Sequence, residues 1–133
     1  ISLLSTLSPR IGALAIITAH SLGRLVPIYF MMAPAVPSHE GMGATYSRAV
    51  RGRDVLASTL LTIVLLFGLI GMHLFIAAAI VAVVGFAFLA YVKKKIGGVL
   101  GDVLGASEQI AESFILLYFV VILTHSIWLS WLI

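Results

Sequence analysis

The sequence contains no cysteine and few charged residues. Without cysteine, neither a disulfide framework nor a thiolate metal site can form. Charged residues make up only 10% of the 133 residues, whereas hydrophobic residues make up 62%. Because a soluble domain has about a quarter charged residues, this composition excludes a soluble globular domain and predicts that the solvent is lipid. The length allows one domain at most.

The first residue is isoleucine, and no positively charged n-region precedes the first apolar stretch. We therefore expect no signal peptide. We also expect the chain to be a fragment or a processed piece of a longer protein.

Long apolar stretches predict an all-α, polytopic membrane protein with about four transmembrane helices and two polar loops. Residues 55–92 would form one helix of about 57 Å, roughly twice the hydrocarbon thickness. We expect this block to fold back near residues 68–73, where two glycines and His73 occur. No strand alternation is visible. The predicted single domain covers residues 1–133, with spans at about 11–33, 55–71, 74–92 and 110–133 and loops at 34–54 and 93–109.

The basic residues predict how the chain is oriented. Three arginines lie in or beside the first loop and three lysines in the second, whereas the opposite side has only Arg10. The positive-inside rule places both loops in the cytoplasm. We therefore expect a multi-pass protein of the inner (plasma) membrane, with its functional site facing the cytoplasm. The lipid bilayer is an expected partner, and nucleic acid is not.

A glycine-rich stretch with one carboxylate precedes the last span. Gly97, Gly101 and Gly105 recur every four residues, which is typical of a groove into which another helix packs. The alternative is a phosphate site, because glycines let the backbone approach a phosphate and successive amides can form an anion cradle. In that interpretation Asp102 is a candidate ligand for the Mg²⁺ that accompanies polyphosphates.

Two carboxylates lie one helical turn apart at the start of the last span. For Glu108 we favour an interaction with the positive end of the helix dipole. Glu112 lies deeper in the apolar sequence. A carboxylate there is costly unless it faces a polar cavity, so Glu112 is a candidate functional residue.

Arg24 lies within the first span, and His20 lies four residues earlier on the same helical face. An unpaired arginine in a membrane is costly, so Arg24 should face the protein interior or an anionic ligand. Glu112, Asp102 or a phosphate could pair with its positive charge. His20 could assist Arg24, but we favour a role as a hydrogen-bonded packing residue.

The loop stretch PSHEGMG (residues 37–43) places Glu40 and Gly41 near the arginine cluster. It is either a simple connector or part of a cytoplasmic binding site. No His/Asp/Glu cluster has zinc-site spacing, and no P-loop is present.

These stretches resemble the cobalamin synthase family, also called adenosylcobinamide-GDP ribazoletransferase. GGVLGDVLGASEQIAESFILL (residues 97–117) is similar to the family's carboxyl-terminal signature, GG-x-TGD-x-LGA followed by an acid-containing helix. EGMG (residues 40–43) resembles the family's EGLG stretch, and Arg24 matches an arginine late in a hydrophobic helix. The resemblance covers about residues 15 to 120.

The sequence departs from the family pattern at several points. Leu100 stands in place of a usual threonine, Gly23 in place of a common serine, and Gln109 at a position often held by glutamate. The aspartate-rich DGLADT-type motif of the family's amino-terminal half is absent. The resemblance therefore implies that this chain corresponds to the carboxyl-terminal half of such an enzyme.

The resemblance also implies a Mg²⁺-dependent phosphotransferase. It would join adenosylcobinamide-GDP to α-ribazole or its 5′-phosphate, giving adenosylcobalamin or its phosphate and releasing GMP. Asp102, Glu112 and Arg24 would be catalytic, with Asp102 and Glu112 as metal ligands. The residues expected to contact substrate phosphates are Gly97, Gly98, Gly101, Gly105, Glu40 and Gly41. The amino-terminal half of the enzyme, or a second copy of the chain, is an expected partner.

Two other functions stay open at this stage. A fragment of a transporter or channel could use Arg24 and Glu112 to line an ion pathway, with its acids near the middle of the membrane. A CDP-alcohol-type phosphotransferase acting on lipid is the other alternative. The paired-aspartate motif of that family is not found in this sequence.

Overall fold

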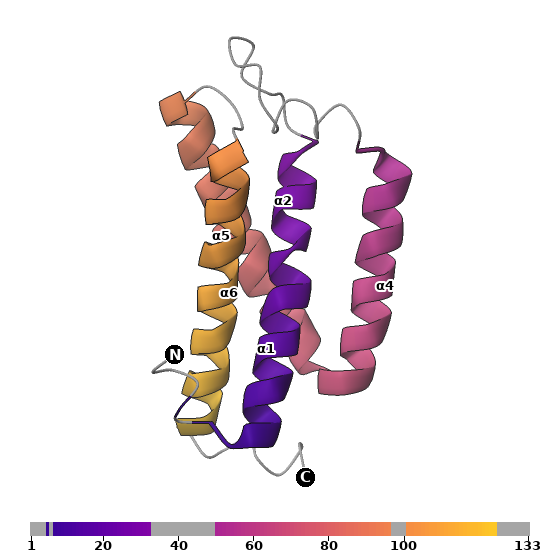
Figure 1. Cartoon of the computed structure of the whole chain (residues 1–133), viewed down its shortest axis with the longest axis vertical. Helices are drawn as coiled ribbons and strands as arrows, with labels where there is room; N and C mark the ends of the chain where they lie inside the picture. The colour runs from indigo at the N-terminus through magenta and orange to yellow at the C-terminus, as the bar shows by residue number, and fades with distance from the viewer. Residues whose placement is uncertain (1–4, 6, 33–49, 97–100, 125–133) are drawn as a thin grey trace.

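The computed structural model describes residues 5, 7–32, 50–96 and 101–124, and its elements are all helices (Figure 1). Four apolar helical stretches within these residues are long enough to cross a membrane, with α1 and α2 together forming one of them. The predicted fold class, an all-α polytopic membrane protein, is confirmed for this part of the chain. The elements are α1 (Pro9–Gly23), α2 (Leu25–Phe30), α4 (Gly52–Ile70), α5 (His73–Ile96) and α6 (Gly101–Thr124).

Several helices extend beyond the predicted spans into polar sequence. Helix α4 begins at Gly52, α5 continues through the three lysines to Ile96, and α6 begins at Gly101 rather than near residue 110. Long basic side chains can keep their charged heads in water while their stems cover apolar surface, so a helix need not end where the apolar sequence ends. The predicted span end at 125–133, most of the first predicted loop and residues 97–100 of the second lie outside the described residues.

Helix α2 continues α1 after an interruption at Arg24 (Figure 1). Pro27 accounts for this interruption, because proline has no N–H to donate to the carbonyl of Gly23 and its ring crowds that carbonyl. The N–H of Arg24 still donates to the carbonyl oxygen of His20 at 3.2 Å. The irregular turn therefore lies where the sequence places its intramembrane arginine.

The core is centred on the packing of α1 against α6, which run side by side in opposite directions (Figure 1). Ala15 and Ala19 of α1 and Ala111 of α6 are fully buried. Small residues let helix backbones approach closely, and in lipid such packing is a main source of helix association. This close approach holds the polar side chains of the two helices within reach of one another.

Helices α4 and α5 form a hairpin whose outer surface is apolar. The turn is at Gly71, which has a φ of 55°, inside the predicted break at residues 68–73. Leu61, Val64 and Val83 are among the large apolar side chains exposed on this hairpin, as expected for a surface in contact with lipid. The α4–α5 turn lies at one end of the bundle (Figure 1). The opposite end, where α2 and α5 end and α4 and α6 begin, is called the loop end below.

Candidate functional site

Two charge pairs connect α1 to α6. Arg24 Nε lies 3.4 Å from Glu108 Oε1, and His20 Nδ1 lies 3.6 Å from Glu112 Oε1. His20 and Arg24 are four residues apart and so lie on one face of α1, as Glu108 and Glu112 do on α6. Because the two helices are antiparallel, the two pairs lie one above the other, like two rungs. The His20–Glu112 contact is an ion pair only when the histidine is protonated. Arg24, His20, Glu108 and Glu112 are together called the ladder below.

The basic side chains of the ladder are exposed on the surface of the bundle, whereas its acidic side chains are largely buried. The side chain of Arg24 is 73% exposed and that of His20 is 58% exposed, against 28% for Glu108 and 12% for Glu112. A cation directed at hydrocarbon is costly, so membrane cations normally face protein, water or an anion. This face of α1 and α6 therefore differs from the apolar outer face of the α4–α5 hairpin.

Glu112 has polar contacts at both carboxylate oxygens. His20 approaches Oε1, and the side-chain amide of Gln109 donates to Oε2 at 3.5 Å. A methyl group at Gly23 would lie 2.8 Å from Glu112 Cγ, which is closer than real side chains approach. The absence of a side chain at Gly23 thus provides the space in which the carboxylate of Glu112 sits.

The ladder lies in the half of the bundle nearer the loop end. At 1.5 Å of rise per residue, Glu108 lies about 10 Å and Glu112 about 17 Å along the axis from the start of α6. The Arg24–Glu108 rung is therefore the one nearer the loop end, and Glu112 lies close to the middle of the helix.

Asp102 is not part of the ladder. It is exposed in the first turn of α6, and no ion pair to it occurs within the described residues. Ten residues of one helix separate Asp102 from Glu112, which is about 15 Å along the axis. Since Mg²⁺ ligands lie at about 2.0–2.1 Å from the ion, these two carboxylates cannot bind one ion in this arrangement. The described part of the chain has no group of three or more His, Asp or Glu side chains placed to hold a metal.

The structure describes only some of the other predicted site residues. Gly101 and Gly105 are exposed on α6, and a methyl group added at Gly105 would meet nothing within 4 Å. Whether they contact a phosphate stays a prediction. The remaining members, Gly97, Gly98, Glu40 and Gly41, lie outside the described residues.

Reasoning from the sequence missed the partner of Arg24. It offered Glu112, Asp102 or a phosphate, and it attributed Glu108 to the helix dipole, whereas the structure pairs Arg24 with Glu108. It also treated His20 as a packing residue, although the ring is more than half exposed and faces Glu112. The available signal was the spacing of four residues in both helices, which permits two stacked pairs if the helices are antiparallel neighbours.

Apolar helices that span a membrane and carry paired charges on one face define a polytopic membrane protein with an intramembrane polar site. Within that class the chain belongs to the cobalamin-5-phosphate synthase family, whose sequence model matches residues 1–120. The resemblance noted in the motifs is thereby confirmed. No solved structure matches the chain.

Three relatives are named adenosylcobinamide-GDP ribazoletransferase. The protein from Rhizobium etli is 33% identical over 111 residues, covering 79% of this chain and 42% of the relative. The protein from Clostridium tetani is 30% identical over 110 residues, covering 82% and 44%. The protein from Sinorhizobium sp is 34% identical over 122 residues, covering 86% and 46%. The chain therefore spans less than half the length of these relatives.

Proposed function

We propose that this chain is the carboxyl-terminal half of an adenosylcobinamide-GDP ribazoletransferase. The complete enzyme would join adenosylcobinamide-GDP to α-ribazole, or to its 5′-phosphate, and release GMP. Membership of the family and the names of the relatives support this proposal. The same observations favour a transferase over a transporter fragment or a lipid phosphotransferase.

The exposure of Arg24 within the ladder is the observation that carries the proposal. The guanidinium contacts Glu108 through Nε, and most of its side chain is exposed on one face of the bundle. A guanidinium has five N–H donors, so this contact leaves donors for a phosphate of the substrate. Charge-assisted bonds from arginine to phosphate are strong and geometrically specific. Arg24 would hold the diphosphate and stabilise the charge that develops during transfer.

Glu112 would act as the base in this reaction. A ribose hydroxyl oxygen forms a bond to the cobinamide-linked phosphorus, and the bond from that phosphorus to the bridging oxygen breaks. GMP leaves with the electron pair, and the hydroxyl proton passes to the carboxylate of Glu112. His20 and Gln109 contact that carboxylate, which keeps it oriented.

Dependence on Mg²⁺ is also part of the proposal. Proteins commonly bind Mg²⁺ through one or two carboxylates together with substrate phosphates and water. Asp102, exposed at the loop end, fits such a single-carboxylate role. The ion would neutralise charge on the diphosphate. Because Asp102 lies about 15 Å along the helix from Glu112, we assign Glu112 to proton transfer and not to binding of the same ion.

The cell membrane, the cytoplasmic orientation of the site and the requirement for an amino-terminal half belong to the same proposal. The basic side chains at the loop end support the orientation through the positive-inside rule. The partial coverage of the relatives supports a missing half. A second copy of the chain is the other candidate partner.

Turnover by membranes tests the proposal. Membranes that contain the chain, alone or with the amino-terminal half of a relative, receive adenosylcobinamide-GDP and α-ribazole, and release of GMP is measured. Losing one donor that stabilises a transition state costs about 100-fold to 1,000-fold in rate, and we expect such a loss for Arg24→Gln. We expect Asp102→Asn to abolish transfer without affecting membrane insertion.

Arg10→Gln is the matched control, because Arg10 is exposed at the far end of α1 from the ladder. It should leave turnover unchanged. Absence of GMP release from both preparations, or near-normal turnover by Arg24→Gln and Asp102→Asn, would contradict the proposal.

A further inference from the structure

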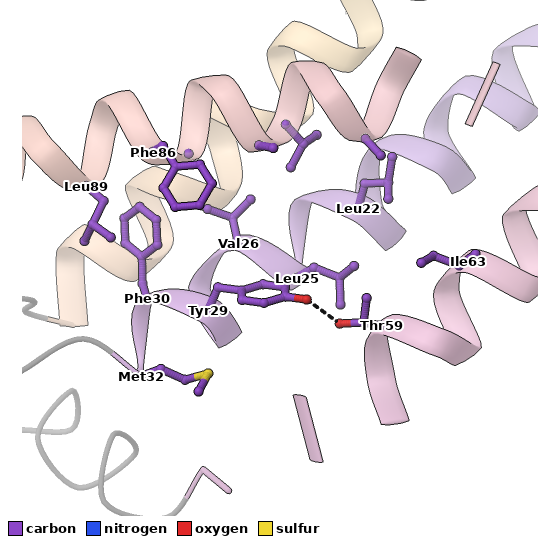
Figure 2. A pocket seen from close by; sticks show the side chains of 14 residues that line it. Leu22, Leu25, Val26, Tyr29, Phe30, Met32, Thr59, Ile63, Phe86 and Leu89 are labelled. Carbon is purple, nitrogen blue, oxygen red and sulfur yellow. Dashed lines mark hydrogen bonds between the residues drawn. The ribbon is translucent and has the colours of Figure 1, made fainter. Parts of the chain in front are cut away.

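An apolar groove of about 520 Å³ lies between α2, α4 and α5 (Figure 2), and no residue of the ladder lines it. All three helices contribute side chains to it. Phe30 of α2 and Phe86 of α5 lie on one side, and Ile63 of α4 lies across from them. A volume of several hundred Å³ is in the range of sites that hold small ligands. This part of the molecule has no role in the proposed transfer reaction.

The polar atoms of the groove are already bonded to one another. The hydroxyls of Tyr29 and Thr59 lie 2.8 Å apart across the groove (Figure 2), and the Thr59 hydroxyl donates to the carbonyl oxygen of Val55 at 2.7 Å. Because a hydroxyl has one proton, Thr59 is the acceptor for Tyr29. No donor of this pair is left for an occupant. The groove therefore favours a hydrocarbon chain over a nucleotide or another polar ligand.

Basic side chains lie on the same helices, just beyond the loop end of the groove. Leu89, which lines the groove, is one turn before Lys93, and the α4 side of the groove begins two turns after Arg51. The exposed basic residues that the structure describes at this end are Arg51, Arg53, Lys93, Lys94 and Lys95. The described carboxylates at this end are Asp54, which lies 3.5 Å from Arg53, and Asp102. Among the described residues, five cations against two carboxylates leave this end positive.

We propose that this groove binds an anionic phospholipid of the bilayer. An acyl chain fills the space between the three helices, and the phosphate of the headgroup lies at Arg51 and Arg53, at the start of α4. Clusters of lysine and arginine at the ends of membrane helices recognise anionic headgroups. The inference rests on the apolar lining, the satisfied hydroxyl pair and the positive end. It does not depend on the proposed transferase activity.

Competition between two lipids tests the headgroup. The full chain, purified in detergent, is mixed with phosphatidylglycerol and phosphatidylcholine that have identical acyl chains, and native mass spectrometry counts the bound lipids. One phosphatidylglycerol should be retained in preference to phosphatidylcholine. An arginine near the membrane surface contributes about 1 kcal/mol, or roughly fivefold in affinity. The double variant Arg51→Gln, Arg53→Gln should therefore lose roughly 25-fold in affinity for phosphatidylglycerol, whereas Arg10→Gln should lose none.

A pair of variants on α5 tests the groove itself. Ala82 and Ala87 are both exposed alanines of this helix, but only Ala82 lines the groove. Ala82→Phe should fill the space and lower retention of the lipid at least tenfold, whereas Ala87→Phe should retain it. Helical circular dichroism and thermal unfolding of both variants show whether the bundle is intact. Equal retention by the two variants would overturn the proposal. So would equal affinity of the unaltered chain for the two lipids, or a dimer that Ala82→Phe abolishes.

Discussion

At the scale of single residues, Glu112 is the side chain whose position requires most explanation. It is buried in a helix long and apolar enough to cross a membrane, where an isolated carboxylate would be costly. Its contacts are with His20 and Gln109, and its methylene groups occupy the space left by Gly23. Removing one partner of a buried charge is strongly destabilising, because the remaining charge stays uncompensated. Gly23, His20 and Gln109 therefore together accommodate the carboxylate of Glu112 between the helices.

Substituting the glycine tests this account. Overpacking a helix interface costs about 1–3 kcal/mol, while alanine in place of a helical glycine gains about 1 kcal/mol. We expect Gly23→Ala to lose stability on balance, because its methyl group would displace Glu112. Thermal unfolding in detergent measures the effect.

Gly105→Ala is the matched control in the partner helix. Apart from its own stretch of helix, nothing described lies within 4 Å of the added methyl group, so only the gain in helix propensity should appear. If Gly23→Ala were as stable as Gly105→Ala, the close contact with Glu112 would not matter for the fold.

At the scale of helices, the sequence predicts which elements exist better than it predicts how they meet. Apolar stretches of sufficient length are themselves the signal for a membrane helix, so the four spans could be found without coordinates. Their ends could not, because charged side chains allow α5 to continue through Lys93 and its neighbours. The Arg24–Glu108 pair depends on α1 and α6 being neighbours, and no local pattern specifies which helices are adjacent. Residues 33–49 and 97–100, which include predicted phosphate contacts, lie outside the described residues.

The hairpin of α4 and α5 gives a prediction at this scale. Gly71 has a φ of 55° and a ψ of −131°, a backbone conformation that L-residues with side chains rarely adopt. A methyl group at Gly71 would meet nothing within 4 Å, so any cost of Gly71→Ala comes from the backbone. Such strained conformations cost about 1–3 kcal/mol. We expect Gly71→Ala to lower the midpoint of thermal unfolding in detergent.

Gly68→Ala is the comparison for Gly71→Ala, because Gly68 lies in the last turn of α4 and has no positive φ. Alanine at this position should be neutral or stabilising through helix propensity. A similar unfolding midpoint for the two variants would indicate that the turn tolerates a side chain and that the break between the helices has another cause.

At the scale of the whole molecule, the two ends of the bundle differ in charge. The loop end carries Arg51, Arg53 and the three lysines of α5, and the Arg24–Glu108 rung lies in the same half of the bundle. The exposed basic residue described at the opposite end is Arg10. A substrate with a diphosphate and an anionic headgroup would both be attracted to the loop end. The orientation of the bundle therefore decides which compartment both proposed ligands must come from.

The absence of cysteine makes this orientation directly measurable. Lys94→Cys introduces one thiol at the loop end, and Met72→Cys introduces one at the exposed α4–α5 turn. Because the positive-inside rule places the basic loop end in the cytoplasm, a membrane-impermeant maleimide added to intact cells should label Met72→Cys and not Lys94→Cys. In inverted membrane vesicles the labelling should reverse. Labelling of Lys94→Cys in intact cells would place the Arg24–Glu108 rung toward the outer compartment. Intracellular nucleotide substrates could not reach the site from there, so this result would contradict the proposed reaction.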